Sequence, residues 1–428
     1  MKNASFFRWF SSVALLVLGV SLVTYRCAQS GLVYLKYLPI GGKDPWQEID
    51  TIPQLGWSPT SLAWSNDGKR VAFAAQSARP FGVVDIETKK ITPLKSEFKG
   101  KGTVHWSTTM NRLALVQDTA FTVYDMNEVP PRALFSVENK FPKVLRNISS
   151  AIVSVQDDDY LILAGNTNWR LEPSNPHIAA YSFKTGERKL AYQFLNPLFD
   201  GIGGSGDPSM TVWGSAVSLN AQNEILVAVT GAATTKILNE AKLKTLVRPR
   251  ILPVVNLTMG KIQCNIELRQ DPLNLSGGER FLGHPSITAL RNAQLILVDE
   301  HLTDVFDMNT CKRVTQLETE LHRPFIEFYA TYEPKGQFPD LEWLEKQKPS
   351  VSQTFTSPDG RWVFGRSPWA PKPSRAPFRL WRASDWKLIH DGTYESDGFI
   401  DTAAFSQDGQ FLAFGSSNRI TFYKLQTK

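Results

Sequence analysis

Histidine and acidic side chains are the first candidates for catalysis or metal binding in this chain of 428 residues. The six histidines do not recur at a spacing that would place two metal ligands together on one helix or strand, and no Gly-x-Ser-x-Gly nucleophile motif is present. His177, His284 and His322 fall in long predicted loops, and loops are where catalytic histidines are most often found. We predict no catalytic residue, no metal site and no cofactor. The remaining histidines are His105, His301 and His390.

A glycine-rich segment and an aspartate triplet resemble two other kinds of site. Residues 201–206 match the GxGxxG phosphate-binding pattern, but Asp207-Pro208 follows in place of a helix, which favours a loop. Asp157, Asp158 and Asp159 could ligate a hard cation. Their position between two apolar runs favours a solvated hairpin turn.

Internal repeats indicate the elements that carry these residues. Residues 63–73, 354–364 and 404–414 each read as an apolar strand, an Asp-Gly turn and a second, alternating strand. Asp-Gly favours a tight hairpin because glycine adopts positive φ without steric cost. Weaker copies of this hairpin occupy residues 104–115, 152–163, 217–227 and 287–298.

A second hairpin follows each of the seven, and the last one ends at the C-terminus without its partner strand. Four strands per repeat, at a period of about 40 residues, predict the blades of a β-propeller. Residues 46–51 alternate in polarity and can supply the missing outer strand, which removes an exposed edge. We therefore predict an all-β fold, a seven-bladed β-propeller over residues 46–428 closed by an N-terminal strand.

The repeats resemble the WD-repeat-like propellers, in their divergent bacterial-envelope form, over about residues 46–428. Val84-Asp85, Tyr124-Asp125 and Phe306-Asp307 stand where that family carries Trp-Asp. The chain departs from the family in lacking the Gly-His pair of each repeat. The resemblance implies architecture more than function, because propellers serve many unrelated functions.

The longest connections are predicted to gather on one face of the propeller. Turns within each hairpin are short, whereas residues 195–213, 231–250, 319–349 and 367–377 connect strands at the opposite face. Long loops in a compact domain are usually functional. Their aromatic and arginine residues suit protein recognition, although the same aromatics could instead pack the insertions onto the disc. The predicted partner-binding residues are Arg248, Arg250, Arg323, Phe325, Phe328, Tyr329, Tyr332, Trp343, Trp369, Lys372 and Arg375.

The N-terminus predicts export across a membrane. Lys2 and Arg8 precede an uncharged, largely apolar run over residues 9–25, which Arg26 ends. Its length is at the lower limit for a transmembrane helix, and cleavage as a signal peptide near Ser30 is the alternative. We assign residues 1–30 to this anchor or signal helix and residues 31–45 to a linker. The predicted entry of the chain into the propeller turns the long-loop face away from the membrane.

Cysteine use and charge add two constraints. Cys264 and Cys311 could pair in an oxidising compartment or stay unpaired, and no cysteine pair has zinc or redox spacing. A formal charge of +6 without a basic stripe excludes a typical nucleic-acid binder.

These features together predict a non-catalytic protein-interaction scaffold. The propeller is expected to be membrane-anchored and extracytoplasmic (periplasmic in a bacterium), with another protein of an envelope assembly as its partner. The alternative is a propeller enzyme, or a small-ligand or carbohydrate binder, that uses the mouth of the central channel. Clustered histidines and carboxylates at that mouth would favour the alternative, and a channel plugged by Phe and Trp would favour the scaffold.

Overall fold

The computed structural model describes most of the chain after residue 45, and its secondary structure there is entirely β-strand. Within those ranges, no helix has the length and hydrophobicity needed to cross a bilayer. The predicted anchor and linker over residues 1–45 lie outside the described residues. The described ranges are 46–52, 58–75, 81–98, 101–118, 120–138, 148–165, 176–194, 209–234, 250–268, 286–299, 302–317, 351, 353–366, 375–395, 400–416 and 419–425.

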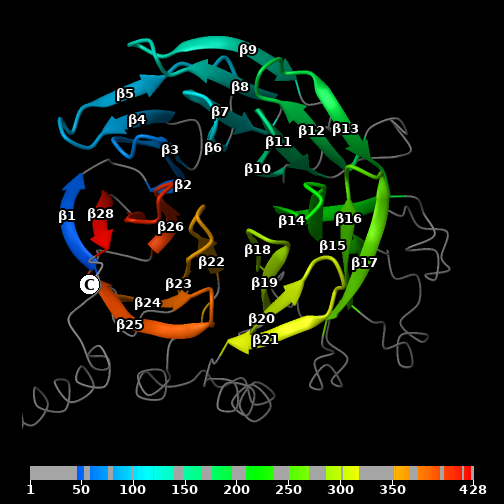
Figure 1. The fold of residues 1–428 in the computed structure, drawn as a ribbon. Coiled ribbons are helices and arrows are strands. Elements are labelled where there is room, and N and C mark those ends of the chain that lie inside the picture. The colour runs from blue at the N-terminus through cyan, green and yellow to red at the C-terminus, as the bar shows by residue number, and fades with distance from the viewer. Residues whose placement is uncertain are drawn as a thin grey trace, which may run out of the picture.

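The strands form seven four-stranded antiparallel sheets. The sheets are arranged around a common centre as the blades of a propeller (Figure 1). This confirms the predicted all-β seven-bladed propeller. In blades 1 to 6 the four strands follow in chain order from the innermost to the outermost.

The first three blades comprise twelve strands. Blade 1 contains β2 (Pro59–Trp64), β3 (Arg70–Ala75), β4 (Phe81–Asp85) and β5 (Ile91–Leu94). Blade 2 contains β6 (Gly102–Trp106), β7 (Arg112–Gln117), β8 (Ala120–Asp125) and β9 (Arg132–Glu138). Blade 3 contains β10 (Ser149–Val155), β11 (Asp158–Ala164), β12 (Ile178–Ser182) and β13 (Arg188–Tyr192).

The remaining blades follow the same order except the last. Blade 4 contains β14 (Ser209–Leu219), β15 (Ile225–Thr234), β16 (Arg250–Asn256) and β17 (Lys261–Leu268). Blade 5 contains β18 (Ser286–Leu290), β19 (Gln294–Asp299), β20 (Leu302–Asp307) and β21 (Arg313–Leu317). Blade 6 contains β22 (Gln353–Thr356), β23 (Trp362–Arg366), β24 (Arg375–Arg382) and β25 (Lys387–Glu395). Blade 7 contains β26 (Ile400–Phe405), β27 (Phe411–Ser416) and β28 (Arg419–Leu425), and β1 (Trp46–Ile52) lies beside β28 in the same sheet.

The Asp-Gly hairpins are held by a serine and an aspartate that bond to each other and to the turn backbone. In blade 1 the Ser65 hydroxyl donates to Asp67 Oδ1 at 2.5 Å and accepts from the backbone N–H of Arg70 at 2.9 Å. Gly68 has a φ of 67°, the left-handed conformation that this turn requires. The same contact recurs at Ser357–Asp359 (2.5 Å) and Ser406–Asp408 (2.6 Å).

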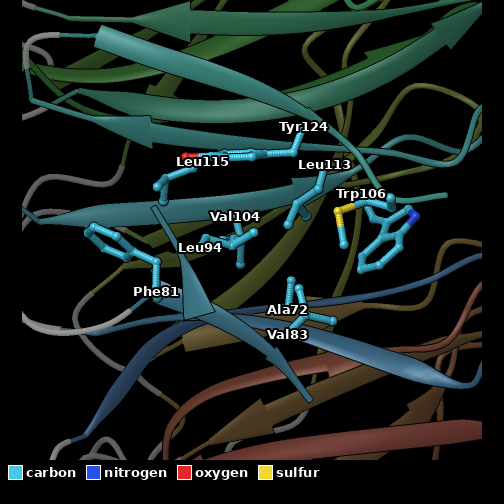
Figure 2. Close-up of a cluster of buried hydrophobic side chains, with 11 residues drawn as sticks. Ala72, Phe81, Val83, Leu94, Val104, Trp106, Leu113, Leu115 and Tyr124 are labelled. Atoms are coloured by element: carbon cyan, nitrogen blue, oxygen red, sulfur yellow. The ribbon is translucent and has the colours of Figure 1, made fainter. Parts of the chain in front are cut away.

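The core is divided among the interfaces between blades. The buried apolar side chains of the described residues form seven clusters, each drawn mainly from two adjacent blades. Figure 2 shows the cluster between blades 1 and 2, where Phe81 of blade 1 lies across from Leu115 of blade 2. Val83 lies across from Leu113 in the same cluster. Each blade therefore depends on both neighbours to bury its two faces, and the ring is stable as a whole.

Arginines add polar links between successive blades. Arg70 of blade 1 donates to the carbonyl of Met126 at 2.9 Å and lies 5.1 Å from the Trp106 ring centroid in blade 2. Arg112 of blade 2 donates to the carbonyls of Phe183 and Lys184 in blade 3, at 2.8 and 3.1 Å. Both arginines are the first residue of the second strand of their blade, so blades 1 and 2 use the same position for this contact.

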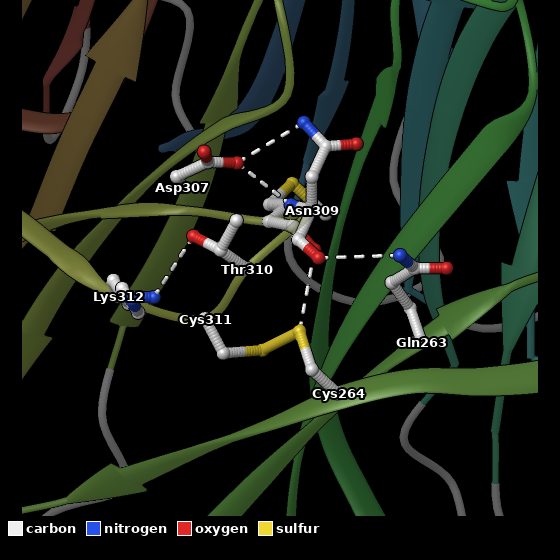
Figure 3. The surroundings of a disulfide bond; sticks show 8 residues. Gln263, Cys264, Asp307, Asn309, Thr310, Cys311 and Lys312 are labelled. Carbon is white, nitrogen blue, oxygen red and sulfur yellow. Dashed lines mark hydrogen bonds between the residues drawn. A yellow bond between two sulfur atoms is a disulfide. The ribbon is translucent and has the colours of Figure 1, made fainter.

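A disulfide bond also crosses a blade interface. Cys264 on β17, the outer strand of blade 4, is bonded to Cys311 in the turn between β20 and β21 of blade 5, with 5.9 Å between the Cα atoms (Figure 3). The pairing that the sequence left open is thus present. The neighbouring side chain of Gln263 donates to the carbonyl of Asn309 in the same turn, at 3.2 Å.

Candidate functional site

Every blade has two edges with different connections. At one, the short-turn edge, turns such as 65–69 and 183–187 join the first strand to the second and the third to the fourth. At the opposite, long-loop edge, the second strand joins the third and one blade joins the next. Segments 195–208, 235–249, 269–285 and 318–350 connect strand ends at the long-loop edge, and their structures lie outside the described residues.

The structure corrects the bounds of these connections. Residues 209–213 and 231–234, which we predicted to be loop, belong to β14 and β15, where Met210 pairs with Ala233. The hairpin of blade 4 therefore extends further than its apolar pattern indicated, because the pairing continues past a bulge near Gly214. Segment 269–285 is a further long connection that the sequence analysis did not single out.

Two of the predicted partner-binding residues lie on described backbone. Arg250 is the first residue of β16 and pairs with Leu268, and Arg375 is the first residue of β24 and pairs with Glu395. Both strands begin at the long-loop edge, and both residues were predicted to be loop. The other nine lie outside the described residues: Arg248, Arg323, Phe325, Phe328, Tyr329, Tyr332, Trp343, Trp369 and Lys372.

Hydroxyl side chains of the innermost strands link blades 2, 3 and 4 around the ring centre. The Ser150 hydroxyl lies 2.7 Å from that of Thr103 and 2.8 Å from His105 Nε2 on β6. The hydroxyl of Ser215 on β14 donates to that of Ser149 at 2.9 Å. We call Thr103, His105, Ser149, Ser150 and Ser215 the inner wall. Because these groups bond to one another across blade interfaces, the inner wall connects the blades. Its hydroxyl groups already have hydrogen-bond partners within the protein.

Two described histidines lie near the candidate surfaces and are neutral at pH 7. His105 is on the innermost strand of blade 2, and His177 directly precedes β12 at the long-loop edge. Burial lowers the pKa of His105 to about 4 and that of His177 to about 4. His177 is 4% exposed, accepts a bond from the Phe194 backbone N–H at Nδ1 (3.2 Å) and packs edge-to-face against the Phe194 ring. This places His177 in a structural role, whereas His284 and His322 lie outside the described residues.

The buried His177 predicts a loss of stability on mild acidification. Its unfolded pKa near 6.5 exceeds the folded value of about 4, so the unfolded chain binds more protons between these pH values and stability falls as the pH drops. Between pH 7 and 5 the free energy of unfolding should fall by about 2 kcal/mol through this residue alone. His177→Asn keeps an acceptor for the Phe194 N–H but has no imidazole to protonate. Urea titrations at pH 7 and pH 5 should show that the free energy of unfolding falls by about 2 kcal/mol less in this variant than in the unmodified protein. An unchanged pH dependence in the variant would show that His177 is not buried in this way.

An arginine and an aspartate approach each other where blades 6 and 7 meet the long-loop edge. Arg366 donates through Nε to Gln353 Oε1 at 3.0 Å and through Nη1 to the carbonyl of Ile400 at 2.7 Å. Burial raises the pKa of Asp401, and the nearby Arg366 charge and a bond from Ser58 oppose that rise. Arg366 and Asp401 therefore make the described long-loop edge polar between blades 6 and 7.

Asp159 is the most heavily bonded carboxylate in the described part of the chain. It is fully buried, and its Oδ2 accepts from the Ser107 hydroxyl (2.5 Å) and from the backbone N–H groups of Thr108 (2.7 Å) and Thr109 (3.2 Å). Its Oδ1 accepts from the hydroxyls of Thr108 (2.9 Å) and Ser154 (2.5 Å). Asp159 therefore binds the first turn of blade 2 to blade 3, and the prediction of a solvated turn is wrong for this residue.

The described residues gather no set of three or more His, Cys, Asp or Glu that could hold a metal ion. The inner strands also differ from a channel plugged by aromatics, since Trp64, Trp106 and Phe405 are buried between blades. The described residues thus show neither the cluster of histidines and carboxylates expected of an enzyme nor the aromatic plug expected of a scaffold. No protein-family model matches the chain, and no curated protein matches it.

Proposed function

We propose that this chain is a membrane-tethered, non-catalytic scaffold that binds another protein of an envelope assembly through the long-loop face of its propeller. Propellers commonly serve as interaction scaffolds. One observation carries the choice of face: the connections at the short-turn edge are all brief, whereas the four longest connections all leave from the long-loop edge, which also has short turns such as the one between β7 and β8. Insertions placed at random would be divided between the two edges.

The composition of these connections supports a protein partner. Segment 318–350 carries Arg323, Phe325, Phe328, Tyr329, Tyr332 and Trp343, residue types that dominate the energetics of protein interfaces. The inner wall supports the scaffold over a small-ligand or carbohydrate binder, because its hydroxyls are already paired between blades. Of the predicted binding residues, Arg250 and Arg375 begin strands at the long-loop edge.

Two features support an extracytoplasmic location. The apolar run over residues 9–25, with Lys2 and Arg8 before it, has the composition of an export signal or anchor. The Cys264–Cys311 bond suits an oxidising compartment such as the periplasm, since disulfides seldom persist in the cytosol. In this proposal the N-terminal helix stays uncleaved and tethers the propeller.

The disulfide gives a direct test of the location. Protein isolated from its source with free thiols blocked during lysis should yield a Cys264–Cys311 crosslinked peptide by mass spectrometry. Replacing both cysteines by serine should lower the free energy of unfolding by about 4 kcal/mol in the chain-entropy view, because the bond closes a loop of sequence separation 47. Recovery of both thiols in alkylated form would contradict the proposed location.

We also propose that β1 closes the ring and that the chain is related to the divergent WD-repeat-like propellers. β1 pairs antiparallel with β28 from Trp46–Leu425 to Ile52–Ile420, which covers the outer edge of blade 7. The relationship is supported by Asp85, Asp125 and Asp307, which stand at the family's Asp position. Each accepts a bond from a backbone N–H of the following turn, at 2.8, 2.9 and 2.7 Å.

The binding face is tested by affinity capture with the detergent-solubilised full chain. The intact protein should retain a stable partner, whereas a chain with residues 319–349 replaced by a short Gly-Ser loop should fold and lose it. Arg323→Ala with Phe328→Ala should weaken capture at least tenfold if these are anchor residues. The matched control is Lys89→Ala with Lys184→Ala, two exposed positions at the short-turn edge. Equal capture by the trimmed and intact chains would refute the assignment of the face.

A further inference from the structure

The outer strands carry a repeated charge pattern at the short-turn edge. In each of blades 1 to 6, the fourth strand begins with a lysine or arginine or directly follows one, and all of these residues are exposed. The recurrence of the same charge at one structural position in six blades is not required by the hairpin turns, whose own residues vary. The residues are Lys90, Arg132, Arg188, Lys261, Arg313 and Lys387.

Exposed apolar side chains accompany these cations. The large hydrophobic residues that are exposed in the described chain are Ile91 (39%), Val129 (79%), Met259 (55%), Val314 (51%) and Leu388 (36%). Every one lies within three residues of one of the six cations, in five different blades. We call the six cations and five apolar residues together the rim. The rim follows the outer circumference of the short-turn face, because it recurs at the same corner of successive blades (Figure 1).

Two of the six rim cations have an acidic partner: Arg132 pairs with Glu128 (3.0 Å) and Arg313 with Asp304 (3.6 Å). Glu187 pairs with Lys189 (2.5 Å) and Asp385 with Arg382 (2.5 Å), and both of these cations lie outside the rim. Glu87 is a further exposed acid near Lys90. Asp67, Asp157, Asp359 and Asp408 lie in the turns of the first hairpins, which are nearer the ring centre than the outer strands. The turns between the third and fourth strands and the residues next to them carry more lysine and arginine than aspartate and glutamate, so the circumference of this face has a net positive charge.

The chain enters the propeller from this same side. β1 begins at Trp46 opposite Leu425, whose backbone N–H bonds to the carbonyl of Gln410 in a turn of the short-turn edge. Residues 26–45 separate that point from the apolar run over residues 9–25. A flexible linker of this length has a root-mean-square span of about 25 Å. An anchor in a bilayer would thus hold the short-turn face close to the lipid surface and make even a weak contact effectively intramolecular.

We infer that the rim is a docking surface for an anionic lipid bilayer, on which the propeller lies with its short-turn face down; this rests on the proposed membrane tether. A partner that touches six blades at the circumference must be flat and extended, and a bilayer surface is both. Lysine and arginine bind anionic headgroups, while isolated aliphatic side chains enter the interface between headgroups and acyl chains. The long-loop face is then presented to its protein partner.

Lysine labelling of the full chain in vesicles tests this inference without a substitution. An amine-reactive reagent and peptide mass spectrometry would compare phosphatidylcholine vesicles with and without phosphatidylglycerol. Labelling should slow about fivefold with the anionic lipid, the factor that one cation contributes at such a surface, at the rim residues Lys90, Lys261 and Lys387 and at Lys312, which is exposed beside Arg313 of the rim. High salt should restore it through screening. Lys95 and Lys101, exposed between β5 and β6 at the long-loop edge, are internal controls and should not change.

Two charge-reversal variants test whether the rim lysines are protected from the reagent by contact with the lipid. Lys312→Glu with Lys387→Glu should abolish the protection of Lys90 and Lys261, whereas Lys95→Glu with Lys101→Glu should leave it intact. Equal labelling of the rim in both lipids would overturn the inference, as would protection at Lys95 and Lys101. Failure of the chain to float with either vesicle would refute the tether and with it this docking. Capture of the protein partner in detergent is measured without a bilayer, so the binding-face proposal stands or fails separately.

Discussion

Asp159→Ala should lower the free energy of unfolding by about 3–5 kcal/mol, the loss expected when a buried hydrogen-bond network is broken. The substitution removes the acceptor for the backbone N–H groups of Thr108 and Thr109, which cannot reverse their role as donors. The hydroxyls of Ser107 and Ser154 lose the same acceptor. The contacts with Ser107, Thr108 and Thr109 join blades 2 and 3, so the effect is on the cohesion of the ring.

The geometry predicts a graded response that identifies the cause. Asp159→Asn should cost only about 1 kcal/mol, because an amide can keep its oxygen at the Oδ2 position and direct its NH2 group toward hydroxyls that are able to accept. Asp157→Ala is the matched control, since Asp157 is exposed in the turn two residues earlier and should change stability by at most about 0.5 kcal/mol. Urea denaturation of the three variants measures this order. A loss of equal size in the alanine and asparagine variants would contradict the assigned bonds.

The sequence predicted the hairpins well where the turn chemistry is local. Ser65, Asp67 and Gly68 contain all that their turn requires within four residues, so the motif can be found by inspection. The first turn of blade 2 has Thr109 where blade 1 has Asp67, and its acceptor comes from Asp159 in the next blade. The missing aspartate was a signal that the acceptor lay elsewhere, but only the ring geometry identifies which residue supplies it.

Contacts between blades and the binding surface were the parts that sequence reasoning could not settle. Cys264 and Cys311 are about one repeat apart, and whether they pair depends on how the outer strand of blade 4 meets a turn of blade 5. The same holds for Arg70 and Arg112, whose acceptors are backbone carbonyls of the following blade. Such carbonyls have no signature in the sequence. All of the predicted binding residues remain predictions, including Arg250 and Arg375, for which the structure gives the backbone position.

In the functions proposed above, the rim and the long-loop face would use one repeated architecture in two separate ways. The rim arises because a cation recurs at the start of the outer strands, whereas the long-loop face arises from insertions that do not repeat. A repeated feature suits a partner that is uniform over the whole disc, and an unrepeated one suits a partner with a defined shape. This difference is the reason for assigning lipid to one face and protein to the other.

Removal of β1 should open the ring. A chain that lacks residues 1–52 should lose about 5 kcal/mol relative to one that lacks residues 1–42, since six residue pairs with β28 are lost and Ile52 leaves its buried cluster. The control retains β1 and lacks only the predicted anchor and part of the linker. Thermal and urea unfolding of the two proteins, with their oligomeric state by light scattering, measure the effect. The exposed edge of β28 should also promote association of the shorter protein.

Because the shorter chain could fail to fold, Ile52→Ala in the full-length protein provides a second measurement. Ile52 is 7% exposed and packs in the cluster that joins blade 7 to blade 1, so its truncation should cost about 2 kcal/mol. If neither change alters stability, blades 7 and 1 are held together without β1. Contacts between the innermost strands, such as the bond from Trp64 Nε1 to the carbonyl of Ala404 at 2.8 Å, would then be sufficient to close the propeller. In that case β1 would be free to detach, and the tether would no longer fix which face of the propeller meets the membrane.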